Sequence, residues 1–172
     1  MKMEHASIFK GGKMIFAIVS ILALSAICGK FCVRMMEKRE RFYSELENLC
    51  LFFKNEIQFL NTKNAVLFDK FFDAYCVSDV QLFKEMKVLA GGEMSVAFEK
   101  TLYLKKNEKQ KIKEFLQNFG KSDQFAMIAC IENFLQWTKM LHEESLTKRK
   151  QNAPLCYKVC LAIGSALCVL IL

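Results

Sequence analysis

Proline and histidine are both scarce in this 172-residue sequence. Proline occurs once, as Pro154, and no segment alternates apolar and polar residues over the length of a strand. A chain with so few breaks favours helix throughout, so we predict an all-α fold. Histidine occurs only twice, and the C-x-x-C, H-E-x-x-H and phosphate-loop spacings are all missing. We therefore expect no metal, no cofactor and no enzymatic activity.

One cluster, His142 with Glu143 and Glu144, could suggest metal binding or acid–base chemistry. Successive residues on a helix point about 100° apart, so these three side chains do not converge on one site. The other histidine, His5, lies far away in the sequence. We interpret the cluster as the solvated face of a helix.

The eight cysteines could form a disulfide framework, but their positions argue against one. Five of them lie in or beside apolar ends of the chain: Cys28, Cys32, Cys156, Cys160 and Cys168. The central region holds only Cys50, Cys76 and Cys130. Buried or membrane cysteines behave as small apolar residues, and a cytoplasmic domain keeps its thiols reduced. We therefore expect all eight to be structural.

What the sequence does contain is a long apolar segment near each end, at 14–33 and 155–172. A typical hydrocarbon core takes roughly 20 helical residues to cross, so both segments predict membrane-spanning helices. A cleaved signal peptide is the alternative for the first, but a charged helix follows it without an A-x-A-like site. The chain thus divides into a tail (1–13), a first span (14–33), a central domain (34–153) and a second span (155–172).

Basic residues flank both spans on the side of the central domain. Lys30, Arg34, Lys38, Arg39 and Arg41 belong to the first group, and Lys148, Arg149 and Lys150 to the second. Such flanks stay on the cytoplasmic side and attract anionic lipid headgroups. We expect a cytoplasmic central domain with both termini outside, and the net charge of +7 directed at the bilayer rather than at nucleic acid.

The apolar periodicity of the central domain predicts a bundle of about six helices. Apolar residues recur every three or four positions at Phe42, Leu46, Leu49, Phe53, Ile57 and Leu60, and again at Phe125, Ile128, Ile131, Leu135, Thr138 and Leu141. The expected helices are 42–60, 65–76, 79–90, 95–104, a helix ending at 119, and 122–149. Ser78 and Ser122 are expected N-caps, residues 105–109 a solvated turn, and Pro154 the break before the second span.

Small residues recur every four positions in both spans: Ser25 and Gly29 in the first, and Cys160, Gly164 and Cys168 in the second. In lipid, small residues at this spacing let helix backbones approach closely. These small residues either form a face on which the helices assemble or are merely tolerated in the spans. The sequence leaves both interpretations open. At the start of the second span, Tyr157 and Lys158 are expected to anchor the helix at the membrane interface.

The segment 115–123 (FLQNFGKSD) joins two amphipathic helices. Its glycine predicts a left-handed residue just past the first helix. The matching positions of a known helix junction, L-G-x-x-L-G-x-S-D, are Phe119, Gly120, Ser122 and Asp123. Leu116 departs from that junction, since it stands where the first glycine is usual.

Other short matches accompany this junction: Glu56-Ile57 followed by Phe59, Ala97-Phe98 with Leu102, and Tyr157-Lys158 at the opening of the terminal span. Their order and spacing between two terminal spans resemble stage III sporulation protein AB of endospore-forming bacteria. The chain departs from that family after Phe59, where Asn-Thr-Lys-Asn replaces an expected Thr-Pro-Leu-Pro turn.

The resemblance implies a place in the mother-cell membrane that surrounds the developing forespore. It further implies a non-enzymatic platform in a sporulation-specific channel or secretion-like complex, similar to the inner-membrane platform of type II secretion and type IV pilus systems. The implied partners are a cytoplasmic hexameric ATPase and other membrane subunits of the channel. The alternative from another class is a membrane-anchored helical regulator or sensor that binds a small ligand.

Overall fold

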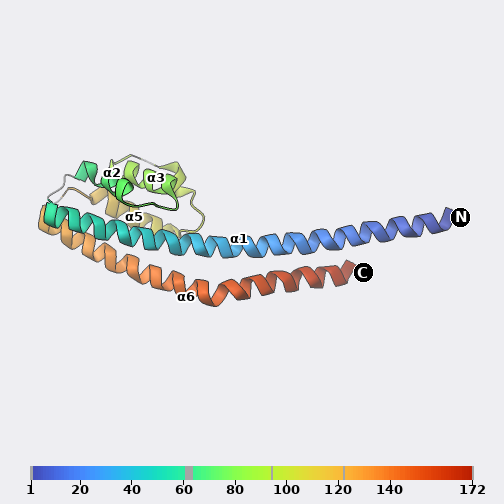
Figure 1. Ribbon diagram of the computed structural model, residues 1–172. Helices are drawn as coiled ribbons and strands as arrows, with labels where there is room; N and C mark the ends of the chain where they lie inside the picture. Colours follow the sequence, from blue (N-terminus) through green and yellow to red (C-terminus); the bar gives the residue numbers. More distant parts are fainter. Residues whose placement is uncertain (1, 61–63, 94, 122, 172) are drawn as a thin grey trace. The chain divides into compact units, whose positions relative to one another are not determined.

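The computed structural model describes residues 2–60, 64–93, 95–121 and 123–171, except for the side chains of 2–14, 60, 64, 65, 97 and 171. Every regular element in these ranges is a helix (Figure 1). The elements are α1 (Lys2–Leu60), α2 (Asn64–Ala74), α3 (Val80–Ala90), α4 (Val96–Glu99), α5 (Lys106–Asn118) and α6 (Gln124–Ile171). The all-α prediction is therefore confirmed, and α4 is a single turn.

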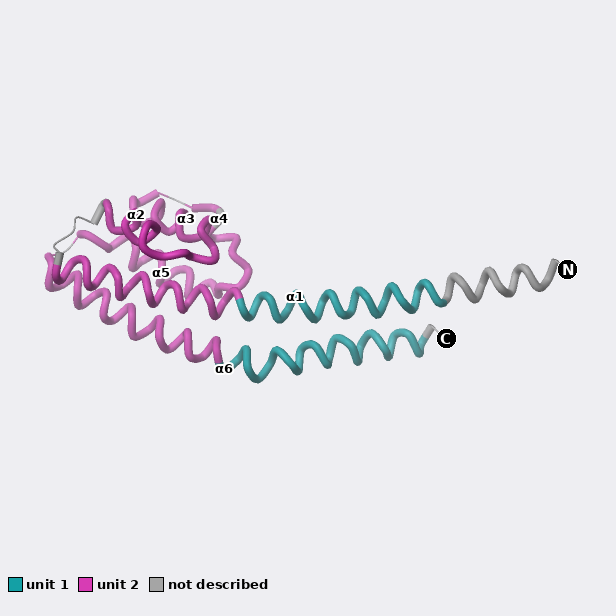
Figure 2. The backbone as a smooth tube through the Cα atoms, in the orientation of Figure 1, with its two compact units in different colours: residues 1–37, 147–172 teal, residues 38–146 magenta. Residues whose placement is uncertain are grey.

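The chain forms two compact units (Figure 2). The terminal unit consists of Met1–Glu37 and Thr147–Leu172, and the central unit of Lys38–Leu146. Helices α1 and α6 contribute to both. Each of them contains an apolar stretch long enough to cross a membrane, as the sequence predicts.

The spans are not separate from the bundle helices, which differs from the expected architecture. Helix α1 is unbroken up to Leu60, and α6 continues through Pro154. Proline removes one backbone hydrogen bond and crowds the preceding turn, but here the helix continues on both sides of it. The expected break at Pro154 is therefore wrong, and the expected arrangement of about six bundle helices between two further spans is not confirmed.

The core of the central unit is aromatic and follows the helical periodicity. On α1, the apolar stripe from Phe42 to Ile57 is buried, as predicted. On α6, Ile131, Leu135 and Leu141 are buried, but Phe125 is 84% exposed. The periodic pattern therefore extends one turn beyond the core, because Phe125 lies in the first turn of α6.

Several helix boundaries differ from the sequence prediction. Asp79, not Ser78, is the N-cap of α3, because its carboxylate accepts the Leu82 N–H. Ser95, the expected first residue of the helix 95–104, is instead the N-cap of α4, and this helix ends at Glu99. The expected solvated turn at 105–109 is wrong, since α5 begins at Lys106.

Candidate functional site

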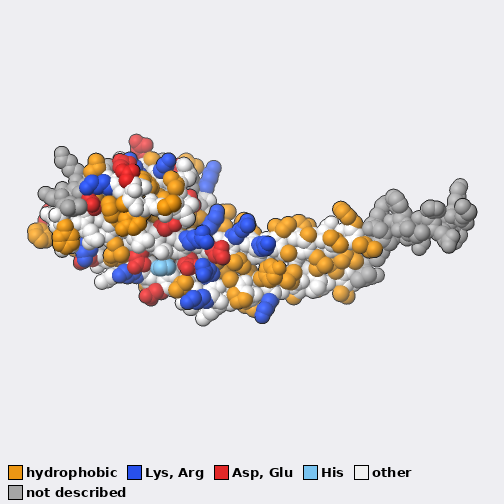
Figure 3. Space-filling model, viewed as in Figure 1, with side chains coloured by type: hydrophobic (Ala, Val, Ile, Leu, Met, Phe, Trp, Pro, Cys, Tyr) orange, Lys and Arg blue, Asp and Glu red, His pale blue; other side chains and the backbone are white. Residues whose placement is uncertain are grey.

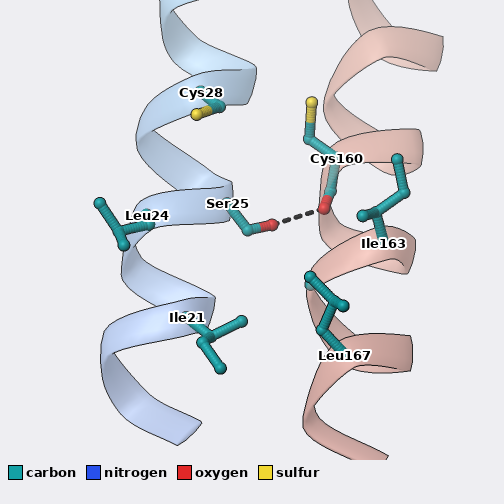
Figure 4. Close-up of a pocket in the computed structure, with 8 residues that line it drawn as sticks. Ile21, Leu24, Ser25, Cys28, Cys160, Ile163 and Leu167 are labelled. Atoms are coloured by element: carbon teal, nitrogen blue, oxygen red, sulfur yellow. Dashed lines mark hydrogen bonds between the residues drawn. The ribbon is translucent and has the colours of Figure 1, made fainter. Parts of the chain in front are cut away.

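The apolar helices of the terminal unit meet along a seam of small side chains. The Ser25 hydroxyl of α1 donates a hydrogen bond to the Cys160 carbonyl of α6 (2.5 Å; Figure 4). Opposite Ser25 lies Gly164, where an added Cβ would stand 2.5 Å from the serine Oγ and 2.7 Å from its Cβ. Only glycine fits at position 164 without a shift of the neighbouring helix.

The seam continues in both directions. A Cβ on Gly29 would lie 3.1 Å from the Tyr157 ring and 3.5 Å from the Cys160 Cβ. At the other end, the Cys168 thiol points toward the Ile18 carbonyl at 3.8 Å. The structure thus brings the five small residues singled out in the sequence onto one intramolecular seam. Of the two expected interfacial residues, Tyr157 packs on this seam and is 39% exposed, whereas Lys158 faces outward.

An open apolar groove of about 360 Å³ runs along one side of the seam. Its walls include Leu24 of α1 with Ile163 and Leu167 of α6, and Cys28 and Cys160 line the same groove (Figure 4). This lining offers no cluster of polar groups for a hydrophilic ligand. It fits hydrocarbon, which is the environment that the sequence predicts for these helices.

The net charge is confined to one unit. The central unit holds sixteen basic and sixteen acidic side chains, whereas the terminal unit holds nine basic and two acidic ones. Charges of both signs are spread over the central helices, and hydrophobic side chains dominate the outer stretches of α1 and α6 (Figure 3). The excess of +7 thus belongs to the terminal unit. Three residues of the predicted first basic flank, Lys38, Arg39 and Arg41, belong instead to the central unit.

A buried ion pair joins three parts of the central unit. The Arg39 guanidinium of α1 donates two hydrogen bonds to the Glu108 carboxylate of α5, at 3.0 and 2.7 Å. It also donates to the Tyr103 carbonyl (3.0 Å) and to the Ser145 hydroxyl of α6 (3.3 Å). Side-chain exposure is 15% for Arg39 and 4% for Glu108. A planar guanidinium suits this fork-like pairing, which fixes the helices relative to one another.

Burial and hydrogen bonding shift the pKa of Glu108 and of the neighbouring Tyr43. Burial by itself would raise the pKa of Glu108, but hydrogen bonds from Arg39 and from the Lys105 N–H hold that pKa below its usual range. Burial raises the pKa of Tyr43, whose ring lies 5.3 Å from the Arg39 guanidinium carbon. The carboxylate is therefore ionised and the phenol protonated at neutral pH.

Sequence reasoning missed this ion pair. Glu108 sits three residues after Lys105 and accepts its backbone N–H at 2.9 Å, which is half of a capping box. The buried residues Ile112 and Leu116 follow at helical spacing. An acidic residue at this offset before an apolar stripe was the available signal, but the surrounding lysines suggested a solvated turn.

The family-motif residues form the junction between α5 and α6. Phe119 is the C-cap of α5 and packs against Phe53, with ring centroids 5.1 Å apart. Gly120 has φ = 84°, the left-handed conformation that the sequence predicts. Asp123 accepts the Ala126 N–H at 2.9 Å and thereby caps α6. The expected N-cap, Ser122, lies outside the described residues.

The remaining motif residues are structural in their placement. Glu56 pairs with Lys70 at 2.7 Å, and Ile57 is buried. Phe98 is fully buried, whereas the side chain of Ala97 lies outside the described part. Ile57 and Phe98 therefore belong to the core rather than to a site.

His142 reaches across to α1 instead of joining a metal cluster. Its Nδ1 lies 3.1 Å from the Glu47 carboxylate, while Glu143 is exposed. Within the described ranges, no group of three or more His, Cys, Asp or Glu side chains could hold a metal ion.

Two large aromatic side chains are exposed where the ends of α1 and α6 meet. Phe59 is 74% exposed, and Phe125 is 84% exposed. The Gln124 side-chain amide donates to the Ile57 carbonyl at 2.8 Å, so the last turn of α1 and the first turn of α6 are in direct contact. Exposed aromatic residues held together in this way are typical of a protein-binding surface.

Comparison with known proteins gives one match. The family model for stage III sporulation protein AB matches residues 13–172, which is nearly the whole chain. No curated protein and no solved structure matches.

Proposed function

Because the chain belongs to the stage III sporulation protein AB family, we propose that this sporulation-related protein is a non-enzymatic membrane platform. It serves a channel or secretion-like complex in the mother-cell membrane, together with other membrane subunits. Its central unit lies in the cytoplasm and docks a hexameric ATPase, and both termini lie outside.

The observation that carries the docking proposal is the exposed pair Phe59 and Phe125. Because the central unit has equal numbers of basic and acidic side chains, it offers no net charge to attract a partner. Burial of the two aromatic rings is the available driving force, since large apolar side chains supply much of the binding energy at protein interfaces. The ATPase therefore docks on the turns that contain these residues.

A docking platform must also be stiff. The ion pair of Arg39 and Glu108 ties α1 to α5, and Ser145 adds α6 to the same cluster. Force applied to the central unit is thus shared by both long helices instead of unravelling one of them. This arrangement supports a role in which motion of the ATPase is handed to a membrane assembly.

Affinity purification of the tagged full-length chain from sporulating cells tests the proposal. A P-loop ATPase should be enriched with the wild-type chain and lost with Phe59→Ser or Phe125→Ser, as measured by quantitative mass spectrometry. Leu102→Ser is the matched control, because Leu102 is also strongly exposed (79%) but lies between α4 and α5. Absence of any ATPase, or equal loss with the control, would refute docking at this surface.

A further inference from the structure

Four cysteines of the terminal unit lie at matching levels of α1 and α6, two on each helix. The seam contacts fix the register, because Ser25 meets Cys160 and Gly29 meets Tyr157 on helices that run in opposite directions. In this register Cys32 of α1 lies level with Cys156 of α6, and the two thiols are close enough to interact. One turn further along, Cys28 and Cys160 line the same groove.

The two helices are in close contact at Gly29, one turn away from Cys32. A Cβ at Gly29 would stand 3.5 Å from the Cys160 Cβ and 3.5 Å from the Tyr157 Cα. Disulfides join Cβ atoms that are ~3.5–4.5 Å apart. Close contact of α1 and α6 one turn from Cys32 and Cys156 is the geometry that a disulfide between them requires, while all eight thiols are free in this structure.

We propose that Cys32 and Cys156 form a modification site, at which a low-molecular-weight disulfide converts the two thiols into an interhelical disulfide. One protein thiolate attacks the small disulfide and expels one half of it as a thiolate. The second protein thiolate then attacks the mixed disulfide and expels the other half. Two protein thiols are oxidised, one small disulfide is reduced to two thiols, and the protons pass from the cysteines to the leaving groups.

Depth in the membrane selects this pair over the neighbouring one. Cys32 and Cys156 lie next to the polar ends of the apolar segments 14–33 and 155–172. Cys28 and Cys160 lie four residues deeper, about 6 Å along each helix. Exchange requires a thiolate, which is unfavourable in hydrocarbon but possible where water reaches the headgroups. This argument rests on the proposed membrane placement of the two helices.

The resulting bond would lock the first span to the second and hold the seam of Ser25 and Gly164 in its present register. Thiols in the surrounding solution would reverse it. The state of the bond therefore reports the thiol–disulfide balance at the side of the membrane where the basic flanks lie.

The test uses the full-length chain in liposomes treated with glutathione disulfide. Free thiols are then blocked with N-ethylmaleimide, and linked peptides are identified by mass spectrometry. We expect a Cys32–Cys156 link that is removed by dithiothreitol. It should be lost in Cys32→Ser and in Cys156→Ser but retained in the matched controls Cys28→Ser and Cys160→Ser.

Four results would overturn the proposal: no linked peptide, glutathione adducts alone, links between two chains, or a Cys28–Cys160 link of equal yield. The wild-type peptide map decides the outcome even where a serine variant fails to insert. None of these measurements involves the ATPase, so they are independent of the docking experiment.

Discussion

Arg39 and Glu108 are 69 positions apart in the chain and form the buried ion pair that joins α1 to the first turn of α5. The guanidinium occupies both carboxylate oxygens and reaches one backbone carbonyl and one hydroxyl as well. A buried charge of this kind is tolerated only while its partner is present, because a lone ion would remain desolvated and unpaired. The central unit therefore depends on both residues.

Truncation of either partner should destabilise the central unit strongly. We expect Arg39→Met or Glu108→Gln to lower the free energy of unfolding by about 3–5 kcal/mol, because each leaves a buried group without its partner. Asp69→Asn is the control, since the Lys87–Asp69 pair is half-exposed and should contribute less than about 1 kcal/mol. Denaturant unfolding of the full-length chain in micelles measures both. A loss below that of the control would contradict this account.

The same ion pair predicts a pH dependence. The pKa of Glu108 is lower in the folded chain than in the unfolded one, so its stabilising contribution is complete above the unfolded pKa. The contribution is lost as pH falls through this lowered pKa. The difference in melting temperature between wild type and Glu108→Gln should therefore be constant from pH 7 to 5 and shrink in acid. A difference that stays constant in acid would show that Glu108 is not ionised in the folded chain.

Substitution at Gly120 should separate backbone strain from loss of contacts. Its φ of 84° costs a β-branched residue about 1–2 kcal/mol, so Gly120→Val should lower the melting temperature. Gly120→Asn should lower it less, because asparagine adopts the left-handed region more readily. Circular dichroism of the full-length chain in micelles follows both variants. Wild-type melting with loss of function would instead identify the junction as a contact site.

The seam of the terminal unit predicts a compensating pair of substitutions. Gly164→Ala should destabilise the helix pair by about 1–3 kcal/mol, because its Cβ would overlap Ser25. Adding Ser25→Gly removes the overlapping atoms and should restore much of the loss. Ala162→Leu, on the exposed side of α6, is the control for added bulk. Equal melting of wild type and Gly164→Ala in micelles would mean that the seam does not hold the helices together.

Labelling of the native cysteines can show on which side of the membrane the central unit lies. Cys76 and Cys130 are exposed, whereas Cys50 is buried and burial raises the pKa of its thiol. If the central unit is cytoplasmic, a membrane-impermeant maleimide should label Cys76 and Cys130 only after the cells are permeabilised. Cys50 should remain unlabelled in both cases and serves as the internal control for folding. Labelling of Cys130 in intact cells would place the central unit outside.

The sequence pattern predicted those features of the fold that depend on residues close together in the chain. The spacing of Phe42, Leu46 and Leu49 identified the buried face of α1, because helical periodicity places such residues on one stripe. The glycine at position 120 predicted a left-handed conformation, because only glycine adopts that conformation without a steric cost. The exact helix ends could not be predicted in the same way. Ser78 and Asp79 are both good N-cap residues, and only the structure shows that the cap is Asp79.

The sequence by itself determined that the chain is helical, that two stretches are apolar enough to cross a membrane, and where small residues recur in them. It could not determine what those residues meet, because a four-residue spacing describes one helix and not its neighbour. Tertiary structure decided that Ser25 faces Gly164 and that Arg39 reaches Glu108. Both contacts join residues far apart in the chain, and their energies depend on burial that exists only once the helices have packed.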